Sequence, residues 1–319
     1  MNTRQETLTH LGSLKAESMS KIDIQKLRSQ YLSNWLGIKN ICLILASWVA
    51  LFLFHLNFFK LEIMVHLAIS YILSAIYFRY ISEWLHEGIH INIHPNRQIS
   101  EFFSSWFLAP TMGIPLTMIR KAHFSHHAAR NFFGKNDADT RHLNIDNRRQ
   151  FFKQILADLS GISAIKAYLS LLLRQQDERQ QAPIGKTVRQ FIPVVSFNLV
   201  LVAIYILSEM YSVLVAHYLA VTTLYVALSR IRAYGQHLKL NENGSWSSTN
   251  SEISRSIEGN FLDRTLISSK LMLNHHEHHK YPALPYRALE VIKNKHQKDI
   301  NVYLRSHMPI LNALIRAKP

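Results

Sequence analysis

Residues 41–59 read ICLILASWVALFLFHLNFF and contain no formally charged side chain. A helix of this length rises about 28 Å at roughly 1.5 Å per residue, against a bilayer hydrocarbon core of about 30 Å. Residues 63–81 follow after Lys60 and Glu62 and are again almost wholly apolar, with Arg79 near the end, where its long side chain can reach the interface. The two runs therefore predict a tight hairpin of two membrane-spanning helices.

A second pair of apolar runs repeats this arrangement. Residues 191–208 and 211–229 are separated only by Glu209 and Met210, and each run is long enough to span a bilayer. The sequence thus predicts an all-α integral membrane protein with four transmembrane helices arranged as two hairpins. A weaker apolar stretch, 102–119, contains two prolines and a glycine, and it is predicted as a re-entrant or interfacial helix rather than a fifth span.

The distribution of charge predicts the sidedness of the protein. Two hairpins return the chain to the side on which it began, so that 1–39, 82–190 and 230–319 share one face, and these segments hold nearly all the Lys and Arg residues. The opposite face shows only Lys60. By the positive-inside rule, the polar segments and both termini are predicted in the cytoplasm, which for a bacterial protein means a multi-pass location in the inner membrane.

The same topology divides the chain into three parts. Residues 1–39 form a polar, basic N-terminal segment, and 296–319 form a basic C-terminal tail. Between them, 40–295 form the membrane domain with its cytosolic parts, 82–190 and 230–295. We expect these cytosolic parts to build a helical cap that carries the histidine-rich motifs described below.

Composition narrows the possible functions. The formal net charge is +15, from 36 Lys and Arg against 21 Asp and Glu. Topology accounts for this excess, so no nucleic-acid partner is expected, whereas anionic membrane lipids suit the basic face. The single cysteine, Cys42, lies inside an apolar run. A disulfide framework and a thiolate metal site are therefore both excluded.

Histidine is unusually frequent, at 18 residues, and half of these residues are grouped. The groups are HEGIH at 86–90, HFSHH at 123–127 and HHEHH at 275–279, and a further histidine ends RAYGQH at 232–237. Helical positions i, i+3 and i+4 share a face, so each group is expected to direct several imidazoles to one point. The nine candidate metal ligands are His86, His90, His123, His126, His127, His237, His275, His278 and His279.

Nine neutral imidazoles on one side of a membrane are enough to hold two metal ions. Imidazole suits iron, copper, zinc and nickel, so the ligand type leaves the metal open. An isolated histidine in a polar loop is more often a surface residue than a ligand, and we expect the other histidines to be structural. These are His10, His55, His66, His94, His142, His217, His276, His296 and His307.

Two other classes of protein use histidines in related ways. HEGIH fits the H-E-x-x-H helix of zinc metalloproteases, intramembrane ones included, in which Glu87 would be the general base. This alternative leaves the six histidines of the other two groups unexplained. A metal transporter would place its ionisable ligands within the spans near the midplane, whereas these groups lie outside the predicted spans.

The motifs and their flanks resemble the membrane fatty acid desaturase family over roughly 40–295. H-x3-H, H-x2-HH and H-x2-HH occur in the order of the family's three histidine boxes. The sequence DADT at 137–140 is similar to the family's D-P-D-T element, with Ala138 in place of proline. The third box continues into PALPYRAL at 282–289, similar to HHxxPxxPxxxL, and RAYGQH is similar to R-x-x-x-E-H with Gln236 in place of glutamate.

This resemblance implies two non-haem iron ions held by the nine histidines, with Asp137, Asp139 and Glu277 as candidates for orienting the ligands. It also implies an O2-dependent oxidase that introduces a double bond into a fatty acyl chain linked to a lipid, to CoA or to a carrier protein. The same boxes serve hydroxylases, ketolases, acetylenases and alkene-forming decarboxylases. The chain has neither a cluster-binding cysteine motif nor the HPGG element of a fused cytochrome b5, so an external electron donor, a ferredoxin or a cytochrome b5, is implied.

Overall fold

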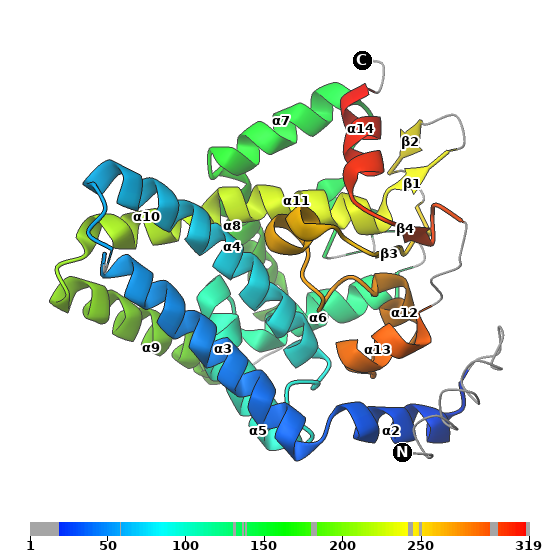
Figure 1. Cartoon of the computed structure of the whole chain (residues 1–319), viewed down its shortest axis with the longest axis horizontal. Helices are drawn as coiled ribbons and strands as arrows, with labels where there is room; N and C mark the ends of the chain where they lie inside the picture. The colour runs from blue at the N-terminus through cyan, green and yellow to red at the C-terminus, as the bar shows by residue number, and fades with distance from the viewer. Residues whose placement is uncertain are drawn as a thin grey trace.

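The structure is a computed structural model, and it describes most of the chain. The described residues are 19–57, 59–129, 132–135, 137, 139–179, 184–241, 245–248, 251–293 and 299–316. The fold is mostly helical (Figure 1). The first part of the predicted N-terminal segment and the end of the predicted tail lie outside the described residues, as do Ala138, His10 and His296.

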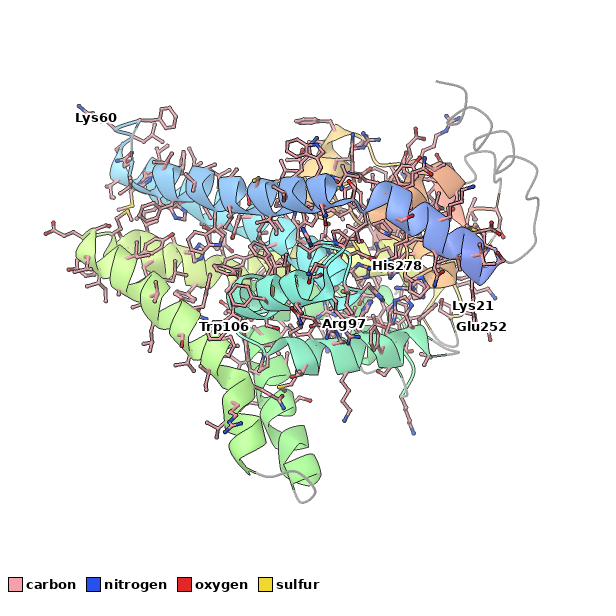
Figure 2. All side chains as sticks on the ribbon, turned by 90° about the horizontal axis from the view of Figure 1, so that it is seen from below. Lys21, Lys60, Arg97, Trp106, Glu252 and His278 are labelled. Carbon is pink, nitrogen blue, oxygen red and sulfur yellow. The ribbon has the colours of Figure 1, made fainter. Side chains whose placement is uncertain are left out.

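Four helices are long and apolar enough to cross a membrane, and they occur where the sequence predicts four spans. These candidate spans are α3 (Asn34–His55), α4 (Ile63–Ile89), the part of α9 (Ile184–Leu207) from Val188 onward, and α10 (Tyr211–Thr222) continued by α11 (Leu224–His237). Figure 2 shows Lys60, in the turn between α3 and α4, at one extremity of the molecule, and His278 far from it in the other half.

The ends of these helices differ from the predicted spans. The helix α3 begins at Asn34 rather than residue 41, because the Ser33 side chain accepts a hydrogen bond from the Leu36 amide and caps the helix start. It ends at His55 rather than residue 59, before a turn in which Asn57 has a φ of 51°. Hydropathy detects the apolar part of a helix, whereas caps and turns decide where the helix ends.

Two helices continue beyond the predicted spans and into the region of the histidines. The helix α4 extends past residue 81 to Ile89, and the fourth span is interrupted at Thr223 before α11 continues to His237. Thr223 has φ −126° and ψ −90°, which no α-helix accommodates. The rigid spans therefore carry two of the histidine motifs directly at their ends.

The stretch around 102–119 is sharply bent. It consists of α5 (Arg97–Phe103), the π-helix η1 (Ser104–Leu108) and the 3₁₀-helix η2 (Ala109–Met112), followed by α6 (Leu116–His127). The two halves meet at 86°, the geometry of a broken span or a re-entrant loop. Gly113 occupies the bend with a φ of 70°, a left-handed conformation that favours glycine.

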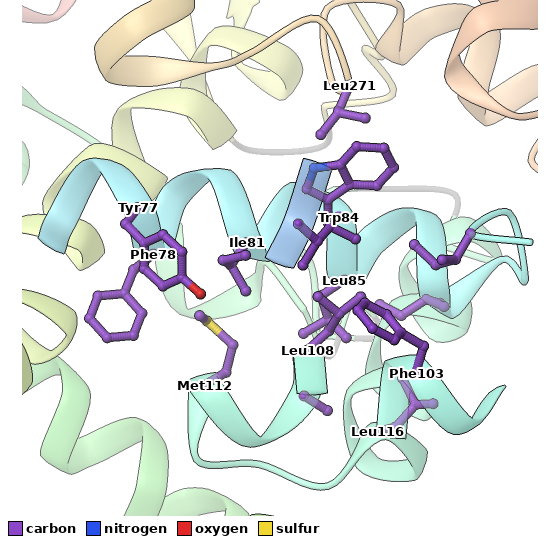
Figure 3. Close-up of a cluster of buried hydrophobic side chains, with 14 of the residues drawn as sticks. Tyr77, Phe78, Ile81, Trp84, Leu85, Phe103, Leu108, Met112, Leu116 and Leu271 are labelled. Carbon is purple, nitrogen blue, oxygen red and sulfur yellow. The ribbon is translucent and has the colours of Figure 1, made fainter. Parts of the chain in front are cut away.

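The largest core cluster joins α4 to this bent segment (Figure 3). Trp84 and Leu85 of α4 pack in one buried cluster with Phe103, Leu108 and Met112 of the bent pair. Between the histidines of HEGIH, a Cβ atom on Gly88 would collide with the Ser104 side chain. Glycine therefore allows η1 to approach the helix that carries the first histidine motif.

Most of the remaining elements lie around the ends of α4 and α11 and are called the cap below (Figure 1). The helices of the cap are α2 (Lys21–Tyr31), η3 (Arg141–Leu143), α7 (Arg148–Leu159), η4 (Asp263–Ile267), α12 (His275–Lys280), α13 (Tyr286–Ile292) and α14 (Met308–Arg316). The helix α8 (Ile162–Arg179) follows α7 and extends away from the cap beside α9 (Figure 2).

The all-α prediction missed four short strands in this cap. The strand β1 (Lys239–Leu240) pairs antiparallel with β2 (Trp246–Ser247), and β3 (Ser256–Ile257) pairs parallel with β4 (Tyr303–Leu304). Strands of two residues carry no alternating pattern that a sequence could show.

A buried polar cluster links all four candidate spans. Ser74 of α4 lies between two imidazoles, with its Oγ 3.3 Å from Nε2 of His55 on α3 and 3.1 Å from Nδ1 of His217 on α10. The other ring nitrogen of His55 lies 2.5 Å from the hydroxyl of Tyr205 on α9. Each helix thus contributes one hydrogen-bonding side chain, which fixes the register of the four helices in a region where unpaired polar groups are costly.

We expect Ser74→Ala to destabilise the protein by about 1 kcal/mol, because it leaves two buried imidazoles without their shared partner. Thermal unfolding in detergent measures the effect. Ser47→Ala is the matched control, since among the described residues the Ser47 hydroxyl bonds only to the Ile44 carbonyl of its own helix. Equal stability of the two variants would contradict a role for Ser74 in joining the spans.

Candidate metal centre

All nine predicted histidines lie together at one end of the long helices, and they form two groups. Within each group, one ligand atom from every member lies within 4.8 Å of the others. The first group contains His86, His90, His123, His127 and His278, and the second contains His126, His237, His275 and His279. They come from the end of α4, from α6, from the end of α11 and from α12.

The second and third histidine boxes are each divided between the two groups. His123 and His127 belong to the five-histidine group and His126 to the four-histidine group, whereas in the third box His275 and His279 separate from His278. Each box therefore directs two imidazoles to one point, whereas the remaining histidine of the second and third boxes points to the other group. Positions i and i+4 are about 40° apart around a helix, while i+3 lies about 60° to the other side of i, so the i,i+4 pairs share a group and the i+3 residue faces the other.

The Nε2 atoms approach one another closely. In the first group, His123 Nε2 lies 3.0 Å from Nε2 of both His90 and His127. In the second, His275 Nε2 lies 2.9 Å from that of His237 and 3.1 Å from that of His279. Two imidazole nitrogens bound at right angles to one ion, each about 2.1 Å from it, are about 3.0 Å apart. The spacing is therefore that of ligands around a metal ion.

The hydrogen-bond partners of the Nδ1 atoms, which point away from the two groups, indicate which nitrogen of each imidazole carries the proton. His237 Nδ1 lies 2.9 Å from the Ile253 carbonyl oxygen, which can only accept, so Nδ1 is protonated and Nε2 carries a lone pair. His123 Nδ1 is likewise 3.2 Å from a carboxylate oxygen of Asp139. Lone pairs are thus directed into both groups, an arrangement that a bound cation stabilises and that repels without one.

Buried ring nitrogens without a hydrogen-bond partner also indicate that the groups are suited to bind a metal ion. Among the described residues, both ring nitrogens of His86 and Nδ1 of His275 and His278 are buried without a hydrogen-bond partner. A buried imidazole that lacks partners on both sides is costly, because its polar atoms have lost water. A metal ion at the centre of the first group would satisfy one nitrogen of His86.

Electrostatics keeps the histidines of the cap in the neutral, metal-binding form. Burial, followed by repulsion from neighbouring imidazoles, lowers the pKa of His275, His278 and His279 well below its usual value. The same causes lower the pKa of His90 to about 2. Protons therefore compete weakly for these nitrogens near neutral pH.

Two of the three acidic residues predicted to orient the ligands contact them. Asp137 Oδ2 accepts a hydrogen bond of 2.8 Å from His126 Nδ1, and Asp139 contacts His123 as described above. Burial raises the pKa of Asp137, but the hydrogen bonds from His126 and Thr140 lower it below the usual range. Glu277 instead accepts a hydrogen bond from Ser256, and within the described part of the chain its carboxylate forms no hydrogen bond with any of the nine histidines.

Two residues inside the motifs lie outside both groups. His276, in the third box, has its Nδ1 2.8 Å from the Ser254 carbonyl oxygen. Glu87 of HEGIH accepts a hydrogen bond of 3.2 Å from the Tyr286 amide at the start of α13. The glutamate therefore contacts the cap, whereas a zinc protease requires it beside the metal. The interpretation as a zinc metalloprotease therefore lacks the general base that it requires.

Sequence reasoning missed the parts of the site that come from the backbone. The Ile253 carbonyl, which fixes the tautomer of His237, carries no side-chain signal. Arg28 of α2 donates a hydrogen bond of 2.8 Å to the Ile91 carbonyl, just after the first box. The prolines and leucine after the third box, by contrast, do have a packing role, since Pro285 precedes α13 and buried Leu289 contacts Leu27 of α2 in one cluster.

A cavity of about 380 Å³ opens beside both histidine groups. Its polar wall includes His86 and His123 from the first group and His126, His237 and His275 from the second. The other walls come from α4, the bent segment, α8 and the end of the fourth span. The apolar side chains among them are Leu85, Ile89, Met112, Ile114, Ile119, Ala164, Ala167, Val221, Tyr225 and Val226.

Fold and site together define a helical protein with four potential membrane spans, whose ends hold nine histidines in two metal-sized groups beside an apolar cavity. The sequence profile of the fatty acid desaturase family matches residues 61–308. The chain belongs to the fatty acid desaturase family, which confirms the resemblance seen in its motifs. No curated protein matches the chain.

We expect Asp137→Asn to weaken metal binding to the four-histidine group by about 10- to 100-fold, because the amide no longer holds His126 Nδ1 as a donor. Metal titration of the purified apoprotein measures this. Asp146→Asn is the control, since Asp146 lies outside both groups and, within the described ranges, its carboxylate accepts a hydrogen bond only from the Gln150 side chain. Unchanged affinity in Asp137→Asn would show that His126 needs no orienting carboxylate.

The metal-free protein is expected to lose stability as the pH falls below about 6.5, the ordinary pKa of histidine. In the unfolded chain, His278 and His279 take up protons near that pH. In the folded state both stay neutral, because burial and the neighbouring imidazoles lower their pKa values. Folding therefore releases protons, and the unfolding free energy decreases on acidification. Denaturant titrations of the apoprotein between pH 8 and 5 test this, and a constant unfolding free energy over that range would rule it out.

Proposed function

We propose that this protein is a membrane-embedded, O2-dependent di-iron oxidase that introduces a double bond into a fatty acyl chain. The observation that carries the proposal is the apolar cavity whose wall contains histidines of both groups. An apolar chain in this cavity would pass both metal positions at once. Membership of the fatty acid desaturase family supports iron as the metal and an acyl chain as the substrate.

The nine histidines would hold two iron ions, five imidazoles on one and four on the other. When bound, iron supplies the O2-dependent oxidation of an unactivated methylene group, which no amino-acid side chain can perform. Overall, two hydrogen atoms leave adjacent carbons of the chain, and O2 together with two electrons and two protons becomes two molecules of water.

The protein's own residues position the reactants. Asp137 and Asp139 hold the Nδ1–H groups of His126 and His123, so that their Nε2 lone pairs stay directed at the metal positions. Leu85, Ile89 and Val221 provide apolar walls that exclude water from the acyl chain. The bound chain is thereby held next to the oxidising centre and away from competing water.

Electrons must come from outside the chain, and we propose a ferredoxin or a cytochrome b5 as donor. We also propose that the termini, the cap and the metal centre face the cytoplasm, because the positive charge lies on that side of the four spans. In a bacterial cell, the protein would lie in the inner membrane. A basic cytoplasmic face favours the approach of an acidic donor protein.

Hydroxylation, ketone formation, triple-bond formation and oxidative decarboxylation use the same class of centre. Which outcome occurs depends on the pose of the acyl chain beside the metal ions. Desaturation is proposed as the reaction, with these outcomes as the alternatives that a product analysis distinguishes.

The decisive experiment is expression in a host that lacks desaturases, followed by mass spectrometry of lipids, free acids and thioester-bound acyl chains. We expect new double bonds with the wild-type protein. His126→Ala and His278→Ala, which remove one ligand from each group, should abolish product and lower the iron content of the purified protein.

His276→Ala is the matched control within the same box, because His276 contacts Ser254 and belongs to neither group. It should retain iron and activity. The proposal fails if the purified protein contains no iron and both ligand variants remain active, and hydroxylated or terminal-alkene products would replace desaturation by one of the alternatives.

A further inference from the structure

A second, larger cavity adjoins the one beside the histidines. It has a volume of about 1010 Å³ and is called the outer cavity below, whereas the smaller one is the inner cavity. The two share several lining residues, among them Ile114, Ile119, Ser163 and Ala167. No histidine of either group lines the outer cavity. The inner cavity therefore lies beside the metal centre, and the outer cavity adjoins it on the side of these shared residues.

The outer cavity contains two lysines that form no ion pair with another described residue. Lys135, in the loop after α6, and Lys166, on α8, both line it and are both exposed. Neither makes a hydrogen bond or ion pair with another residue in the part of the chain that the structure describes. Their ammonium groups are free to bind an anion.

The other charged groups of the outer cavity already have partners. Arg230 donates to both carboxylate oxygens of Asp158, at 2.5 and 2.8 Å. Asp139 contacts His123 Nδ1, which ties its carboxylate to the metal centre. The groups left for a ligand are consequently the two lysines, and the remaining lining residues include apolar Met118 and Phe133.

The two cavities together match the two ends of an amphiphile. The inner cavity is lined mostly by apolar surface, although Asp139, Arg230 and Arg232 also line it beside the histidines. The outer cavity joins apolar surface to two unpaired ammonium groups. An ammonium group recognises carboxylate and phosphate as a point charge, without the fixed geometry that arginine demands. A chain with its tail in the inner cavity would leave an anionic head beside Lys135 and Lys166.

We propose that the outer cavity binds the anionic head group of the acyl substrate, with Lys135 and Lys166 as the anchoring residues. This inference rests on the proposed function, and it makes the substrate an acyl compound with a carboxylate or phosphate head rather than a neutral ester or glyceride. The head group would also fix how far the tail enters the inner cavity, and hence which methylenes lie beside the metal positions.

Equilibrium binding to the purified, iron-loaded full-length protein in neutral detergent at pH 8.5 tests the inference. The probes are radiolabelled palmitate, 1-palmitoyl lysophosphatidate and methyl palmitate, which share a tail and differ in the head. We expect both anions to bind more tightly than the methyl ester. In the double variant Lys135→Gln/Lys166→Gln, affinity for the anions should fall by about tenfold or more, because each lysine contributes electrostatic attraction.

Three controls keep the result specific. Binding of methyl palmitate should be unchanged in the double variant, which shows that the inner cavity is intact. Lys135→Arg/Lys166→Arg should keep the preference for anions, and Lys153→Gln, an exposed lysine on α7 that lines neither cavity, should behave as wild type. Comparison of palmitate with lysophosphatidate identifies whether carboxylate or phosphate is preferred.

The inference is overturned if wild-type protein binds the anions and the ester equally, or if the glutamine variant keeps the preference. Its failure is distinct from failure of the proposed function, because binding requires no turnover. If anion binding depends on the two lysines but no oxidised product forms, the head-group site is supported and the proposed desaturase activity is contradicted. Double bonds formed from a neutral ester, with equal efficiency in the glutamine variant, would remove only the head-group site.

Discussion

The arrangement depends on one electrostatic constraint, the convergence of unprotonated imidazole nitrogens. His237 and His123 donate their Nδ1 protons outward, to Ile253 and Asp139, and so direct lone pairs inward. Neighbouring Nε2 atoms then lie about 3 Å apart. Such lone pairs repel one another, and a cation converts the repulsion into coordination. The helices α6 and α12 present nitrogens to both groups, whereas α4 contributes only to the five-histidine group and α11 only to the four-histidine group.

The rest of the fold holds these helix ends in place. The polar cluster around Ser74 joins the four candidate spans, and the packing of Trp84 and Leu85 against the bent segment fixes α6 beside α4. On the cap side, α2 and α13 pack together through Leu27 and Leu289. The histidines thus project from elements that are each fixed by separate contacts, as a preorganised metal site requires.

The sequence could predict the candidate spans and the nine clustered histidines, because both depend on local patterns. Hydropathy located the four helices, although it placed the end of α4 at residue 81 while the helix continues to Ile89. The spacing i, i+3, i+4 could indicate that His126 faces away from His123, but it could not predict that His237 and His275 join His126, since that depends on where α11 and α12 lie. The role of the Ile253 carbonyl could not be predicted, because any residue type supplies a backbone carbonyl. Glu277 was expected to orient a ligand, but it accepts a hydrogen bond from Ser256.

The cavity beside both groups would hold an acyl chain next to both proposed metal positions. The central claim is that each group holds one iron ion. Anomalous diffraction at the iron absorption edge, from crystals of protein purified with its native metal, tests that claim most directly. Two anomalous peaks are expected, one among the five histidines and one among the four. A single peak, no peak, or signal only at the zinc edge would contradict that claim.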